Sequence, residues 1–336
     1  MAEWLERAAV KLFGTLALLA VSSGLAAQTV VGRDSPPDPF AFFRSVVPIT
    51  ASDRQNIARG QSIVRILPGR DRQVAVFTAV PLQADGDRLI AWIRHIVQLK
   101  KNPVVLAIGR FSRTPDVADL AGLTLDEDDV RTIRGCSETD CGIKLTPAEI
   151  RELQQTVPDT SRAGPSLQET FRRIVVRRVV QRETAEPADT AAPAVRLWDP
   201  DQTVEVDAFT YWSKERFSGK PVISATHVRI LRSIDSRLPD VIVAEDQVFA
   251  THYINKSTSL IALLRGDGDG PNYLAYLNRS QVDVLGGLLG GVVRMGVEHR
   301  LKAQAPTVLK DLRRKIESGI PEDEAADLQT PAVNYR

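Results

Sequence analysis

The segment RSQVDVLGGLLGGVVRMGVEHR, residues 279–300, carries two adjacent pairs of glycines inside an apolar run. Apolar residues recur there at spacings of three and four, and Ser280 followed by Asp283 suits a helix start, so the segment predicts a helix. Each glycine inside a helix costs about 0.8–1 kcal/mol relative to alanine. A helix that keeps both pairs is expected to let something approach its backbone closely. The pairs are Gly286–Gly287 and Gly290–Gly291.

Three explanations of these glycines compete. Their four-residue spacing occurs in paired membrane helices, but the uncharged run ends at Arg294 and is short for a membrane span. A phosphate-binding loop would need the lysine and hydroxyl residues of the P-loop pattern, which this segment lacks. The third explanation is a helix laid across a curved sheet, where the glycines admit the sheet or a ligand. In the simplest form of this third explanation, the helix packs closely against the sheet and no ligand is involved.

Two kinds of periodicity divide the rest of the chain. Alternating apolar and polar residues predict a hairpin and then further strands, over residues 61–80, 102–112, 211–217, 221–231, 241–254, 259–264 and 272–278. Helical spacing and capping signals predict helices over residues 87–101, from Thr146 onward, over 166–182 and over 307–318.

This order of elements resembles the START or birch-allergen-like helix-grip superfamily over about residues 61–318. The resemblance begins with QVAVFTAVPLQADGDRLIAWIRHIVQL, a strand followed by an amphipathic helix, and continues with strands and a C-terminal helix. It implies an α+β fold in which an antiparallel sheet wraps around a long C-terminal helix, with a hydrophobic cavity between them. A helical insertion over about residues 113–195 would interrupt the domain. The implied function is binding or carrying a lipid or another apolar small molecule, without catalytic residues.

The first 27 residues predict export. Arg7 and Lys11 precede an apolar stretch that ends in small residues, the layout of a signal peptide cleaved near Ala26 or Ala27; an uncleaved membrane anchor is the alternative. Residues 28–60 are predicted to be a linker with short helices, and residues 319–336 a disordered acidic tail. In an exported protein the only two cysteines, Cys136 and Cys141, predict a disulfide.

The chain has 43 basic and 42 acidic residues, so its charge gives no reason to expect nucleic acid as the main partner. A basic amphipathic helix over residues 172–182 suggests either contact with an anionic membrane surface or a solvated face whose arginines pair with acidic neighbours. Its arginines are Arg172, Arg173, Arg177, Arg178 and Arg182.

Candidate ligand-binding residues follow from the helix-grip hypothesis. The walls of the cavity would be Trp212, Tyr253, Tyr276 and the glycine segment, with His252 and Arg279 as polar groups. Neither a metal nor a cofactor is predicted. Two alternatives remain: an envelope structural or interaction protein without a small ligand, and a hydrolase-like enzyme using His227 or His252, although a lone histidine on an apolar strand face is more often a hydrogen-bonded core residue.

Overall fold

The computed structural model describes residues 38–69, 72–156, 165–184, 200–217, 220–266, 270–285 and 290–320. Contacts divide the chain into two compact units, Met1–Pro36 and Pro37–Arg336, and the described residues all belong to the second. Three predictions therefore lie outside the described residues: the signal segment 1–27, the pair Gly286–Gly287, and the acidic tail beyond residue 320.

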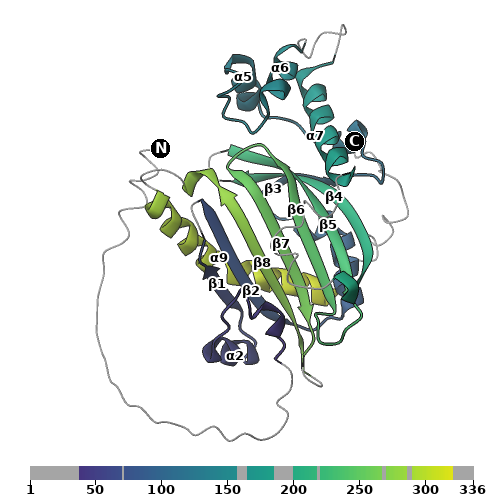
Figure 1. Ribbon diagram of the computed structural model, residues 1–336, viewed down its shortest axis with the longest axis vertical. Coiled ribbons are helices and arrows are strands. Elements are labelled where there is room, and N and C mark those ends of the chain that lie inside the picture. The colour runs from purple at the N-terminus through teal and green to yellow at the C-terminus, as the bar shows by residue number, and fades with distance from the viewer. Residues whose placement is uncertain are drawn as a thin grey trace, which may run out of the picture. The chain divides into compact units, whose positions relative to one another are not determined.

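Eight antiparallel strands form one sheet in the order β1-β2-β8-β7-β6-β5-β4-β3 (Figure 1). Every residue of β2 is paired with a residue of β8, so strands from the two ends of the described chain share this sheet. The predicted α+β class with an antiparallel sheet is confirmed. The strands are β1 (Ile63–Leu67), β2 (Gln73–Leu82), β3 (Val105–Arg110), β4 (Thr203–Phe217), β5 (Lys220–Ser233), β6 (Val241–Ala250), β7 (Ile254–Leu264) and β8 (Asn272–Val282).

Several helices begin where the sequence supplies a capping residue. The Asp85 carboxylate accepts a hydrogen bond from the backbone N–H of Arg88 at 2.8 Å, and Thr146 with Glu149 forms the predicted capping box. No helix among the described residues is long and apolar enough to cross a membrane. The elements are η1 (Ala41–Phe43), α2 (Ala51–Ala58), α3 (Gly86–Arg94), α4 (Ile96–Lys100), η2 (Val117–Leu120), α5 (Glu127–Gly135), α6 (Pro147–Gln154), α7 (Leu167–Thr184), η4 (Pro200–Gln202), η5 (Asp283–Leu285) and α9 (Gly290–Ser318).

Side chains alternate between the two faces of the sheet, and apolar clusters bury both. On the first, which we call the helix face, strand residues such as Val243 form one buried cluster with Ile93 of α3 and with Leu309 and Ile316 of α9. The opposite face, which we call the outer face, is covered in two parts. The segment around Phe43 packs on one half, and the helices between β3 and β4 pack on the other.

The helices η2, α5, α6 and α7 lie between β3 and β4 in the chain, where the helical insertion was predicted, and we call them the insertion. Their core includes Phe171 of α7 and extends to Trp212 and Phe249 of the sheet. Cys136 and Cys141 form the predicted disulfide immediately after α5.

Two local predictions were wrong. The helix predicted to start at Ser280 does not: residues up to Val282 continue β8, because pairing with β2 on one side and β7 on the other satisfies their backbone groups. Helix α9 begins only at Gly290. The amphipathic helix predicted over residues 87–101 is broken at His95 into α3 and α4.

Candidate functional site

The helix face of the sheet changes from apolar to polar along its strands. One cross-strand row runs Val243–Ile261–Tyr276, and the next row, two residues further along each strand, runs Glu245–Ser259–Asn278. Because residues two apart in a strand point the same way, the polar row continues the face that packs against α3 and α9. The apolar core therefore ends at a polar patch on the same surface.

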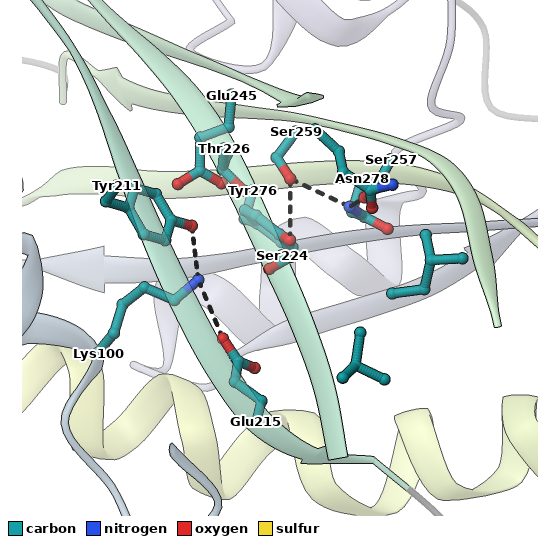
Figure 2. A pocket seen from close by; sticks show the side chains of 13 residues that line it. Lys100, Tyr211, Glu215, Ser224, Thr226, Glu245, Ser257, Ser259, Tyr276 and Asn278 are labelled. Atoms are coloured by element: carbon teal, nitrogen blue, oxygen red, sulfur yellow. Dashed lines mark hydrogen bonds and ion pairs between the residues drawn. The ribbon is translucent and has the colours of Figure 1, made fainter. Parts of the chain in front are cut away.

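A pocket of about 190 Å³ lies over this polar patch, and Figure 2 shows its side chains. Strands β4 to β8 supply its floor, and α4 supplies Lys100 from the side. Two of the lining side chains are aliphatic, and the others are polar or phenolic. The lining residues are Lys100, Tyr211, Glu215, Val222, Ser224, Thr226, Glu245, Gln247, Ile254, Ser257, Ser259, Tyr276 and Asn278.

Lys100 links α4 to β4. Its ammonium donates a hydrogen bond to the Tyr211 hydroxyl at 2.8 Å, and its Nζ lies 3.9 Å from a carboxylate oxygen of Glu215 (Figure 2). The side chains of Lys100 and Glu215 are 32% and 35% exposed, so this ion pair is partly screened. Burial alone would lower the pKa of Lys100, but the negative charges of Glu215 and Glu245 and the hydrogen-bonded Tyr211 raise that pKa above its ordinary value.

Both tyrosines of the pocket are neutral near pH 7. Burial raises the pKa of Tyr211, and burial together with the charge of Glu245 raises the pKa of Tyr276 to about 12. The Tyr276 hydroxyl lies 3.2 Å from Ser259 Oγ, and the Asn278 amide donates to the same oxygen at 3.0 Å. One wall of the pocket is therefore a hydrogen-bonded network of neutral groups.

Glu245 makes no hydrogen bond or ion pair with the other residues that line the pocket, so its carboxylate is open to a ligand (Figure 2). Its charge nevertheless raises the pKa of Lys100 and of both tyrosines, so it lies close to all three. The pocket holds two carboxylates, Glu215 and Glu245, against one ammonium. A ligand that enters the pocket could therefore donate a hydrogen bond to the Glu245 carboxylate.

Of the predicted cavity residues, Tyr276 lines the pocket, while Trp212 and Arg279 lie elsewhere. Trp212 points from the outer face into the insertion, where its indole N–H donates to the Asp119 carbonyl at 2.9 Å. Arg279 follows Tyr276 by three residues in β8 and so lies on the outer face, beyond Leu277. Strand alternation separates residues that the sequence places close together.

Two more of the predicted residues, His252 and Tyr253, are also outside this pocket. His252 and Tyr253 lie in the turn between β6 and β7, and Tyr253 has a positive φ of 56°. Gly290 and Gly291 are the first two residues of α9. Whether the glycine segment contacts a ligand stays a prediction.

His252 joins the turn between β6 and β7 to the insertion. Its Nε2 lies 3.1 Å from a carboxylate oxygen of Asp129, and its Nδ1 lies 3.1 Å from the Gly142 carbonyl oxygen. The ring therefore bridges a carboxylate and a backbone carbonyl of the segment between β3 and β4. His252 and Asp129 are each 5% exposed, and Lys220 Nζ lies 3.7 Å from the same carboxylate. This buried hydrogen-bonded contact ties the turn to the insertion.

His227 lies on the outer face of β5, with its Nδ1 3.1 Å from the Thr210 hydroxyl. Burial lowers its pKa to about 4, which makes it a weak base at neutral pH. The described residues contain no group of His, Cys, Asp and Glu side chains arranged to hold a metal ion.

The arginines of α7 have partners within the protein. Arg178 donates to Glu149, Arg177 to Glu152 and Arg173 to Glu169. Arg172 donates to the Leu123 carbonyl, and Arg182 lies 3.4 Å from Asp246. These contacts favour the ion-paired interpretation of this helix, and contact with an anionic membrane stays a prediction.

The sequence prediction missed most of the pocket, although a signal was present. Polar residues occupy alternate positions in four strands, in pairs separated by one residue. Such alternation along a strand predicts that one face of the sheet is polar. Here the alternating polar residues lie on the helix face, which is apolar at the other end of the same strands. The pairs are Ser224 and Thr226, Glu245 and Gln247, Ser257 and Ser259, and Tyr276 and Asn278.

In comparisons with known proteins, no family model, no curated protein and no solved structure matches this chain.

Proposed function

We propose that this chain is an exported small-molecule-binding protein of the helix-grip type, with a ligand more polar than the lipid that the resemblance implied. The observation that carries the proposal is the polar pocket on the helix face, and above all the carboxylate of Glu245, which makes no hydrogen bond or ion pair with the other lining residues. Ligand sites are typically concave, with a few polar groups that fix the ligand's orientation. This pocket offers many such groups.

The arrangement of elements supports the helix-grip part of the proposal. The amphipathic helices α3 and α4 follow β2, and the C-terminal helix α9 contacts β1, β2 and α3. Leu309 and Ile316 of α9 are buried in the cluster on the helix face, where the helix-grip arrangement would place them. The disulfide after α5 and the apolar N-terminal stretch support export.

The polar groups favour binding over catalysis as the role of the pocket. A general base works best when its pKa lies near the working pH. The pKa values of Lys100, Tyr211 and Tyr276 are all raised, so none of the three is a base at neutral pH. Fixed donors and acceptors suit recognition of a ligand's hydrogen-bonding pattern.

Thermal unfolding of the full chain tests this proposal against a panel of small polar compounds and fatty acids. A ligand at ten times its Kd stabilises the folded state by about 1.4 kcal/mol, which raises Tm by roughly 2 °C for a chain of this size. We expect a polar compound to produce this shift with the wild type and with Glu127→Gln, an exposed glutamate of α5, but not with Glu245→Gln.

Two results would contradict the proposal. One is stabilisation by palmitate alone, unchanged in Glu245→Gln. This result would favour the lipid carrier that the helix-grip resemblance implied. The other is no shift with any compound, which would favour an interaction protein without a small ligand.

A further inference from the structure

The charges around the pocket restrict what can occupy it. An anionic ligand would meet the carboxylates of Glu215 and Glu245. A cationic ligand would meet the ammonium of Lys100, which is fixed by its hydrogen bond to Tyr211. A neutral ligand avoids both repulsions. It must still satisfy a carboxylate that only accepts hydrogen bonds and an ammonium that only donates them.

Hydroxyl groups meet both demands at once, because each has one donor and two acceptor positions. We propose, building on the function proposed above, that the ligand is a neutral polyhydroxylated molecule the size of one sugar or cyclitol ring. One of its hydroxyls donates to Glu245, and another accepts from Lys100. The geometry that points to this ligand is the placement of Glu245 and Lys100 on different elements around one small pocket (Figure 2).

The spacing of the floor suits several hydroxyl groups. Ser257 and Ser259 are two residues apart on β7, about 6.6–6.8 Å along the strand. Ser259 lies directly across from Glu245 on β6 and Asn278 on β8, with about 4.7–4.9 Å between neighbouring strands. Polar groups at these intervals can reach different hydroxyls around a single ring.

The size and walls of the pocket fit the same ligand. Its volume of about 190 Å³ is below the roughly 300–1,000 Å³ of pockets for drug-sized molecules, so a single ring is more suitable than a chain of rings. The rings of Tyr211 and Tyr276 offer apolar surface for the C–H faces of a sugar or cyclitol, while their hydroxyls stay protonated.

Isothermal titration calorimetry of the full chain with matched probes tests this inference. The neutral probes are myo-inositol and D-glucose; the charged probes are D-glucosamine, D-glucuronate and choline. All are used at millimolar concentration, below the range in which polyols stabilise proteins by exclusion from their surface. We expect a neutral probe to bind at least tenfold more tightly than any charged one.

Variants locate the binding. Glu245→Gln keeps the shape of the side chain but removes its charge, and we expect it to weaken binding of the neutral probe tenfold or more. Ser259→Ala, which removes one hydroxyl of the floor, should weaken binding severalfold and serves if Glu245→Gln does not fold. Glu127→Gln should bind as the wild type does.

The outcomes separate this inference from the function on which it rests. Tighter binding of choline, glucosamine or glucuronate, lost in Glu245→Gln, would overturn the neutral ligand and leave the polar binding protein standing. If the wild type and both pocket variants bind myo-inositol or glucose equally, the binding site lies outside this pocket. That result would overturn the inference. No binding of any probe together with no stabilisation by any polar compound would overturn both.

Discussion

His227 is expected to make the protein less stable in acid. Its ring lies on the outer face of β5 beside Thr210, and burial lowers its pKa from 6.5 to about 4. The unfolded chain therefore binds a proton more readily than the folded one between these two pH values. The contribution of neutral His227 is fully present above about pH 6.5 and is lost as the pH falls towards 4.

The size of this effect follows from the two pKa values. The difference of 6.5 − 4 = 2.5 units sets an upper limit of about 3 kcal/mol, at about 1.4 kcal/mol per unit. At pH 5 His227 is protonated in most unfolded molecules and neutral in most folded ones. The free energy of unfolding at pH 5 is therefore about 2 kcal/mol lower than at pH 7.

Urea unfolding at pH 7 and pH 5, followed by tryptophan fluorescence, measures this loss. The variant His227→Gln has no titrating ring, so its free energy of unfolding should fall by about 2 kcal/mol less than that of the wild type. Burial raises the pKa of Asp246, opposite His227 on β6, and this contributes a stability change of the opposite sign. Because Asp246 is present in both chains, the difference between them mainly reports His227.

His299→Gln provides the control, since His299 is exposed on α9. It should show the pH dependence of the wild type. If the wild type and His227→Gln lose the same free energy between pH 7 and pH 5, His227 is not held neutral by burial, and the argument fails.

Three further changes test the packing around the sheet. Thr78→Val should raise the free energy of unfolding by about 1 kcal/mol in urea titrations, because the Thr78 hydroxyl is buried without a hydrogen-bond partner among the described residues; an unchanged or lower value would contradict this. Replacing both Cys136 and Cys141 with serine should cost about 2 kcal/mol from the loop-closure relation, measured in the same way, and a loss that reduction of the wild type does not reproduce would point to another cause. Asp129→Asn removes a buried carboxylate that lies 3.1 Å from His252 Nε2 and 3.7 Å from Lys220 Nζ, and it should cost about 2 kcal/mol by thermal or urea unfolding, while Asp128→Asn, at an exposed position, serves as control.

The sequence predicted the class of most elements because local patterns determine them. Alternation located the strands, and the capping box at Thr146 located the start of α6. The errors occurred where a distant partner overrode a local signal. Ser280 has the chemistry of a helix cap, but its backbone pairs with Val74 on one side and Ser257 on the other, so the chain stays extended.

The pocket was harder to predict because it depends on register. Tyr276 and Arg279 are close in sequence, and only the strand period shows that they occupy opposite faces. Lys100 reaches Tyr211 across 111 residues of sequence, because β3, the strand after α4, pairs with β4. No spacing within the sequence reports such a contact.

The polar end of the helix face departs from the rule that the rest of the sheet obeys. A sheet face that packs against helices is most stable when it is apolar, and the row through Val243 and Ile261 follows that rule. Two residues further along, the chain places Glu245 and Ser259 instead. The hydroxyl of Ser259 is hydrogen-bonded to neighbouring groups, whereas the carboxylate of Glu245 makes no hydrogen bond or ion pair with the other residues that line the pocket. Departures of this kind concentrate at functional sites, because a ligand recovers the missing interaction. The proposal of a polar ligand therefore rests less on the pocket's shape than on the polar side chains, Glu245 above all, that the chain places on a face that is apolar elsewhere.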